Sequence, residues 1–206
     1  MEQALRIAVL AGAAWALAGL ALLAVRARAY GPKSYLAAPA GSAAAGVAYA
    51  FGPGMSPTAK ESTREHPGAY LTGVGYHLGV FAALACLVLL LADRPPHGAA
   101  LRVLQLLTLA GAACGAGLLV KRLSVPYLRG ISCADDVVAN LLTTGFAALA
   151  FAATLAPGAR AAFLAETTAL LLYVPLGKIR HCFFFFPTRY HMGFFYGRRG
   201  TFPPGA

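Results

Sequence analysis

The sequence predicts an all-α membrane protein in which five transmembrane helices form one bundle. Of its 206 residues, 59% are hydrophobic and only 12% are charged, and the mean hydropathy is +0.66. A soluble domain of this length does not need so much apolar surface. The chain also contains five apolar runs of about 20 residues, the length that crosses a bilayer. We expect these spans at about 5–25, 69–91, 101–120, 137–156 and 161–181.

The first run, 5–25, is interpreted as a transmembrane helix and not as a signal peptide. Its apolar core is too long for a signal peptide, and the residues after it do not form a cleavage site. The longest loop follows at 27–67 and is rich in Pro, Gly and Ala. Gly and Pro interrupt it too often for a sixth span, so a re-entrant or interfacial segment is expected. No internal repeat is visible, and residues 1–206 are expected to form a single domain.

Basic residues predict how the bundle is oriented. Thirteen of the 17 Lys and Arg residues lie in 26–66, 121–136 and 178–206. Cytoplasmic loops carry the excess of Lys and Arg, so the N-terminus is expected outside and the C-terminus in the cytoplasm. The loop 27–67 and the tail 182–206 are then cytoplasmic. The positive charge indicates orientation and contact with anionic lipid or a protein partner, and nucleic-acid binding is not expected.

The cysteines do not predict a metal site of their own. Cys86, Cys114, Cys133 and Cys182 are isolated in the sequence, and no pair has CxxC spacing. Neither an iron–sulfur cluster nor a structural zinc site is therefore expected.

Two histidines lie in apolar runs, where a bare imidazole is costly without a partner. His77 lies inside the second span, in the segment TGVGYHLGVF, and His181 lies at the end of the fifth span. With the expected orientation both are near the cytoplasmic side, and helix bundles hold cofactors between side chains of facing helices. Three glycines around His77 leave room for a flat macrocycle, although small residues also serve plain helix packing. The spacing is compatible with two axial ligands of one haem b, and equally with histidines that hydrogen-bond to polar neighbours.

Haem propionates are anionic and favour basic side chains near the membrane surface. Arg64, Lys178 and Arg180 are at the expected depth. The alternative is that they contribute only to the orientation signal.

Three segments resemble the membrane cytochrome b family of the respiratory nitrate reductase gamma subunit. The segments are GYHLGVF (75–81), KRLSVPYLRGISCADDVVANLL (121–142) and YVPLGKIRHCFFFFPTRYHMGFFYGRRGTFPP (173–204). The similarity is closest to the branch found in sulfite-reductase-associated and heterodisulfide-reductase-type complexes. It covers most of the chain after residue 66 and agrees with the expected five spans.

The resemblance implies an electron-transfer subunit that works with quinone, with each haem b held by one histidine from the second helix and one from the fifth. The cytoplasmic-side pair corresponds to His77 and His181. The family's outer pair corresponds to Leu87 and Phe163, neither of which can bind iron. The outer haem is therefore expected to be absent.

A second haem is an alternative that uses His66 and His191. His66 precedes His77 by eleven residues, or about 16 Å along a helix. Against this reading, Pro67 follows His66 directly and Pro187 precedes His191, and proline interrupts helices. The two side chains then serve as interfacial groups, hydrogen-bond partners of quinone or contacts to a soluble subunit.

The expected function is a haem b subunit that relays electrons between the quinone pool and a cytoplasmic iron–sulfur protein. Such a chain is not catalytic alone, and it lies in the inner (cytoplasmic) membrane of a bacterium or archaeon as a multi-pass protein. Quinone is expected near the loop 27–66 and the aromatic residues that follow His181. The alternative is a haem-free anchor for a soluble oxidoreductase.

Overall fold

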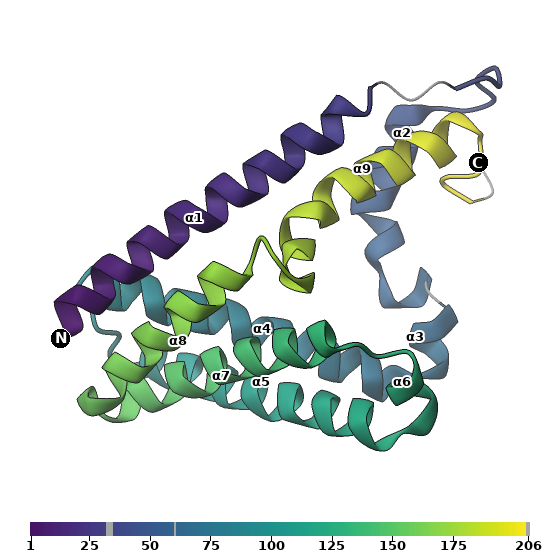
Figure 1. Ribbon diagram of the computed structural model, residues 1–206. Coiled ribbons are helices and arrows are strands. Elements are labelled where there is room, and N and C mark those ends of the chain that lie inside the picture. The colour runs from purple at the N-terminus through teal and green to yellow at the C-terminus, as the bar shows by residue number, and fades with distance from the viewer. Residues whose placement is uncertain (32–34, 60, 205–206) are drawn as a thin grey trace. The chain divides into compact units, whose positions relative to one another are not determined.

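The computed structural model describes residues 1–31, 35–59 and 61–204, without the side chains of residues 61 and 62. Within these ranges the chain is helical, and no β-strand occurs. The helices are α1 (Glu2–Ala29), α2 (Ala43–Phe51), α3 (Glu61–Glu65), α4 (Pro67–Leu91), α5 (Gly98–Ser124), α6 (Pro126–Gly130), α7 (Ala134–Leu155), α8 (Arg160–Tyr173) and α9 (His181–Arg198) (Figure 1). Single 3₁₀ turns lie at Pro53–Met55, Pro57–Ala59, Pro157–Ala159 and Lys178–Arg180.

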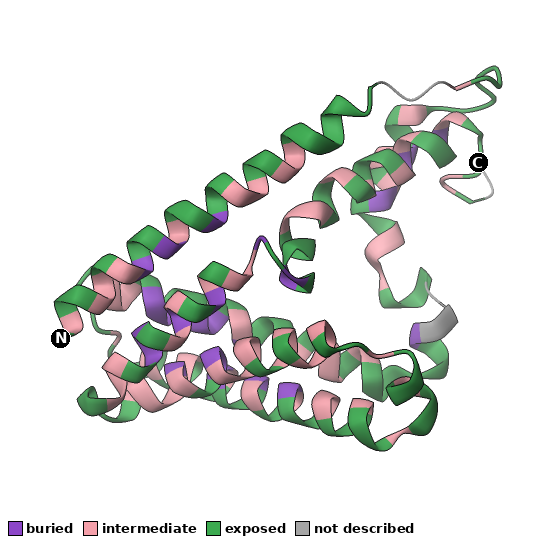
Figure 2. Ribbon diagram, viewed as in Figure 1, coloured by how far each residue is buried: buried purple, intermediate pink, exposed green. Residues whose placement is uncertain are grey.

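The predicted class, an all-α membrane protein, is confirmed. In the described ranges four helices, α1, α4, α5 and α7, are long and apolar enough to cross a membrane. A fifth span is present if Pro157–Tyr173 and Lys178–Arg198 are taken together. Only 17% to 28% of the residues in the four apolar windows are buried, and Figure 2 shows long exposed stretches on these helices. Uncovered apolar surface on this scale belongs in lipid.

The fifth predicted span, 161–181, is wrong beyond Tyr173, where α8 ends. Pro175 has no N–H to continue the hydrogen-bond ladder, and its ring conflicts with the preceding turn. The chain turns instead, and the amides of Leu176 and Gly177 both donate to the carbonyl of Tyr173, at 2.9 and 3.1 Å. The Tyr173 ring lies against Gly177, so a side chain at this position would require the ring to shift. His181 therefore begins a new helix, α9, and does not end the fifth span.

The regions predicted as loop and tail also contain helices. Within 27–67 the chain forms α2, two 3₁₀ turns and α3. Ser42 caps α2, since its hydroxyl accepts a hydrogen bond from the amide of Ala45 at 3.2 Å. The predicted tail, 182–206, is helical as far as Arg198.

The chain forms two compact units. Unit 1 comprises Met1–Ala21 and Gly68–Ile179, and unit 2 comprises Leu22–Pro67 and Arg180–Ala206. Helix α1 contributes its first part to unit 1 and its last turns to unit 2. Each unit has its own helix contacts and is described separately below.

In unit 1, α7 packs against both α5 and α8. Phe146 of α7 and Phe163 of α8 are fully buried and stack with ring centroids 5.3 Å apart. Helices α4 and α5 meet at Gly79 and Gly111, where a Cβ built on Gly111 would lie 2.5 Å from the Cα of Gly79. Trp15 ties α1 to this unit, because its Nε1 donates to the carbonyl oxygen of Leu172 at 3.0 Å.

In unit 2, α2 packs along α9. Gly46 of α2 faces Gly193 and Gly197 of α9, and all three are buried. A Cβ on Gly193 would lie 2.7 Å from the carbonyl oxygen of Gly46. The two backbones are therefore in direct contact, as small residues allow between helices.

Candidate functional site

His77 lies in the interior of α4, with its side chain exposed. Its Nδ1 is 2.7 Å from the carbonyl oxygen of Gly73, one helical turn earlier. A carbonyl oxygen only accepts hydrogen bonds, so Nδ1 carries the ring proton and the lone pair of the neutral imidazole is on Nε2. Histidines that bind metals commonly donate their second ring N–H to such a backbone carbonyl. The local geometry thus fits an axial ligand that binds through Nε2.

The three glycines around His77 have different surroundings. Gly73 has open space where a side chain would stand, with no atom within 4 Å of a built Cβ. Gly75 faces the Sγ of Cys114 at 3.1 Å, and Gly79 is pressed against α5. Gly79 therefore serves helix packing, whereas Gly73 leaves a gap on the face that it shares with His77, one turn away. Beside Gly73 the surface of α4 is open.

Tyr76, the residue directly before His77, forms a polar network that was not predicted from the sequence. The Tyr76 hydroxyl makes a short hydrogen bond with Thr143 Oγ1 and a second one, of 3.0 Å, with Thr144 Oγ1. Asn140 continues the network: its Oδ1 accepts from Thr144 at 3.1 Å, and its Nδ2 donates to the carbonyl of Gly115 at 3.2 Å. The available signal was the group of polar residues at 140–144 inside an apolar run.

This network joins α4, α5 and α7 beside His77. Since a hydrogen bond inside an apolar bundle has no water to replace it, the network holds α4 at a fixed rotation about its own axis. Tyr76 is therefore a positioning residue for the neighbouring imidazole of His77.

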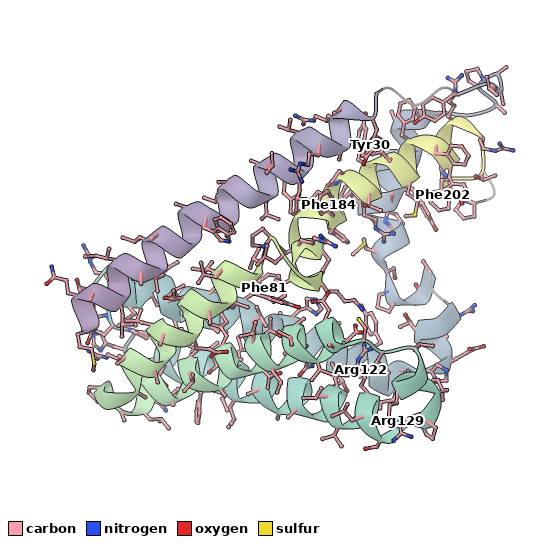
Figure 3. All side chains as sticks on the ribbon, in the orientation of Figure 1. Tyr30, Phe81, Arg122, Arg129, Phe184 and Phe202 are labelled. Atoms are coloured by element: carbon pink, nitrogen blue, oxygen red, sulfur yellow. The ribbon has the colours of Figure 1, made fainter. Side chains whose placement is uncertain are left out.

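Lys178, one of the expected propionate partners, is engaged in an ion pair in unit 1. Its Nζ lies 2.6 Å from Asp136 Oδ1, in the first turn of α7. Arg122 approaches the same carboxylate at 3.6 Å and also donates to Ser132 at 3.0 Å. Figure 3 shows Arg122 near the end of α5. The cluster links the turn after α8 to the beginning of α7.

The other two expected propionate partners belong to unit 2. Arg64 is exposed in α3, and Arg180 is exposed directly before α9. His181 is the first residue of α9 and is also exposed. Because His77 is in unit 1 and His181 in unit 2, their meeting across one haem stays a prediction.

The second pair of histidines, His66 and His191, lies in unit 2. His66 is exposed between α3 and α4, and Pro67 begins α4, so the expected helix break at this position is found. The expectation that Pro187 interrupts the stretch to His191 is wrong, since α9 continues through this proline. A proline removes one backbone hydrogen bond, and a helix can continue through it when neighbouring groups satisfy the freed carbonyl.

Leu87 and Phe163, the positions where the resemblance led us to expect no outer haem, lie in the apolar core of unit 1. Leu87 and Phe163 are both buried there, in one cluster with Leu164. Side chains of α4, α7 and α8 fill this region.

A groove of about 1160 Å³ lies within unit 2. Its lining comes from the last turns of α1, from Gly31 and Tyr35, from Phe51 and from α9. This is the region, around the loop 27–66 and the aromatic residues after His181, where quinone was expected.

Among the described residues no three His, Cys, Asp or Glu side chains gather as a metal site. A haem needs fewer protein ligands than such a metal site, since two histidines complete the coordination of its iron. Comparisons with protein-family models, with curated proteins and with solved structures found no match.

Proposed function

We propose that this chain is a haem b membrane subunit of a respiratory complex. It relays electrons between the quinone pool and a cytoplasmic iron–sulfur subunit, with His77 and His181 as axial ligands of one haem. It is not catalytic alone. It lies in a bacterial or archaeal cytoplasmic membrane, with its N-terminus outside and its C-terminus in the cytoplasm.

The observation that carries this proposal is the hydrogen bond from His77 Nδ1 to the carbonyl of Gly73. It selects the tautomer in which Nε2 can bind iron and orients the ring on the exposed face of α4. The open space beside Gly73 and the resemblance of 75–81 and 173–204 to a cytochrome b family support the same reading.

Each residue of the candidate site then has a definite task. His77 and His181 hold the iron, and Tyr76 fixes the rotation of α4. Arg64 and Arg180 offer positive charge to the propionates. Lys178 is already paired with Asp136, so its part is to hold the turn that precedes His181. When bound, haem b supplies one-electron chemistry, and the protein sets its ligation, orientation and potential.

A haem assay on the purified chain tests the proposal. We expect one haem b per chain by pyridine haemochrome, with a reduced-minus-oxidised spectrum typical of two histidine ligands. His77→Ala and His181→Ala should each abolish the bound haem while the chain still inserts into membranes.

His97→Ala is the matched control, because His97 is exposed in the turn between α4 and α5 and should leave haem content unchanged. If the wild-type chain is folded, membrane-inserted and free of haem, the proposal is wrong and the chain is a haem-free anchor.

A further inference from the structure

A small pocket lies at one end of unit 1, where α4 and α7 end and α5 and α8 begin (Figure 1). Its volume is about 200 Å³, the space of roughly six or seven molecules of liquid water at about 30 Å³ each. Residues from all four helices line it, so its walls are part of the helix bundle. Neither His77 nor His181 is among these residues.

The inner wall of this pocket is apolar. Cys86 and Leu90 contribute from one face of α4, Ala150 and Ala153 from the last turns of α7, and Phe163 from the first turn of α8. Cys86 and Phe163 are buried. A space with this lining favours an apolar group as its occupant.

The mouth of the pocket is polar and open to the surroundings. It lies beside the turn between α4 and α5, where Pro95 and His97 line the pocket and are exposed. Arg160, the first residue of α8, also lines the pocket and is partly exposed. The pocket thus combines an apolar interior with a cation near its opening.

Arg160 makes no hydrogen bond or ion pair with another residue in the part of the chain that the structure describes. The nearby acid, Asp93, is paired with Arg6 at 2.7 Å and acts on Arg160 only through its charge. The hydroxyl of Thr154, another lining residue, donates its proton to the carbonyl of Phe151 at 2.6 Å. Arg160 is therefore the side chain with N–H groups available to an anion.

The beginning of α5 adds positive potential at the mouth. His97 precedes this helix without a capping hydrogen bond from its side chain, and the first backbone bond runs from Leu101 to His97 at 3.4 Å. The amides of residues 98–100 have no acceptor among the described residues. Such helix ends favour anions, so the helix supports the charge of Arg160.

The position of the pocket along the helices indicates which anion it meets. The apolar helix α4 ends at Leu91, and α5 begins at Gly98. Two spans joined by so short a turn end where the hydrocarbon meets the lipid head groups. The apolar wall then lies at the depth of acyl chains, and Arg160 lies at the depth of phosphates.

We propose that this pocket binds one phospholipid molecule. Arg160 donates charge-assisted hydrogen bonds to the phosphate, and part of an acyl chain enters the apolar space beside Cys86. This inference goes beyond the proposed electron relay and does not depend on a bound haem.

Two other occupants fit the lining less well. Cys86 and His97 are residue types that bind metal ions, but Arg160 lines the same pocket and would repel a cation. The described residues also offer no group of three metal ligands. A free phosphate would satisfy Arg160 but would leave the apolar wall in contact with water.

The thiol of Cys86 can report on occupancy of the pocket. In a full chain with Cys114→Ala, Cys133→Ala and Cys182→Ala, Cys86 is the remaining thiol. Its alkylation by N-ethylmaleimide is followed by mass spectrometry in dodecyl maltoside, a detergent without phosphate. We expect dihexanoyl phosphatidylglycerol to slow the reaction in a saturable way, because the lipid blocks access to the thiol.

Variants of Arg160 test the role of its charge. Arg160→Gln should weaken the apparent Kd of the lipid about tenfold, since a charge-assisted contact is lost, whereas Arg160→Lys should keep most of the affinity. Arg102→Gln is the matched control: Arg102 is exposed near the beginning of α5 and does not line the pocket, so its loss should leave Kd unchanged. Thermal unfolding of each variant checks that the fold is intact.

Two results in the alkylation assay would overturn the proposal. The first is an unprotected Cys86 in the parent chain, or protection that is equally strong in Arg160→Gln. The second is equal protection by inorganic phosphate, which would assign the site to a free anion.

Native mass spectrometry gives a readout that does not use the thiol. The wild-type chain and Arg102→Gln should each retain one phospholipid more than Arg160→Gln when detergent is removed from the ions. Equal numbers of bound lipids in all three chains would contradict the site. Neither measurement needs haem, so a haem-free chain that still binds the lipid would refute the electron relay and keep this pocket.

Discussion

The Nζ of Lys178 lies 2.6 Å from Oδ1 of Asp136, an ion pair that joins the turn after α8 to the first turn of α7. The Asp136 side chain is only 11% exposed and also faces Arg122 at 3.6 Å. The backbone amide of Cys133 donates to the other oxygen of this carboxylate at 3.0 Å. Within unit 1, the turn after α8 is therefore held to the beginning of α7 by charge.

A double-mutant cycle on Asp136 and Lys178 should reveal this tie. Because Lys178 is half exposed, solvent screens the pair, and we expect a small but measurable coupling free energy. Thermal unfolding in detergent of the two single variants, Asp136→Asn and Lys178→Gln, and of the double variant measures it. Strictly additive losses would mean that the ion pair contributes nothing to stability.

Removal of the Tyr76 hydroxyl should destabilise unit 1 modestly and, under the proposed function, shift the haem potential. Tyr76→Phe leaves Thr143 and Thr144 without this partner, and single hydrogen bonds in membrane bundles contribute about 0.6 kcal/mol on average. We expect a small loss of unfolding free energy, together with a shift in the potential of the haem that we propose beside His77. Tyr127→Phe, at an exposed tyrosine in α6, is the control and should change neither quantity.

The contact between α4 and α5 should not accept even one methyl group. Gly111→Ala places a Cβ against the backbone of Gly79, and overpacking typically costs about 1–3 kcal/mol. Gly117→Ala, on the same helix but with nothing within 4 Å, should be neutral or stabilising because alanine favours helix by about 1 kcal/mol. Equal stability of the two variants in equilibrium unfolding would contradict the close helix contact.

Acid should weaken the link between Arg6 and the α4–α5 turn. Arg6 donates to Asp93 at 2.7 Å, and this hydrogen bond, together with the nearby positive charge, lowers the pKa of the Asp93 carboxyl below its ordinary value. A depressed carboxyl pKa stabilises the folded state above the unfolded pKa of aspartate, and this contribution is lost as the pH falls through the folded value. Asp93→Asn should therefore lower Tm at neutral pH and make no difference in strong acid. A Tm gap that does not depend on pH would exclude this ion pair as its cause.

Thiol labelling tests the orientation proposed for the bundle. Cys133 is exposed in a segment placed on the cytoplasmic side. A membrane-impermeant maleimide should label it in inverted vesicles and not in intact cells. His97→Cys, in a background without Cys133 and Cys182, should show the opposite pattern because the α4–α5 turn is placed outside. The reverse result at both positions would invert the proposed orientation.

The four long helices were predictable because length and hydropathy alone define a span. The break after Tyr173 was missed because the apolar run continues past Pro175. The prediction gave more weight to this apolar composition than to the N–H that proline lacks. The opposite error occurred at Pro187: a helix break was predicted there, but α9 continues through this proline. The Tyr76 network forms because α7 packs close to α4. The hydrophobic pattern within one segment does not show which helices pack together, so the network could not be predicted. His77 was selected as a candidate because an imidazole inside an apolar run is unusual, and its role stays a prediction.

The seam at Gly46, Gly193 and Gly197 has a consequence for the groove in unit 2. Where two backbones touch without intervening side chains, neither helix can roll about its long axis without collision. This glycine contact thereby keeps the side of α9 that bears Tyr190 and His191 facing the groove, although the glycines have no reactive side chains. Larger residues at these three glycines would turn this side of α9 relative to the groove while every side chain that lines the groove was still present.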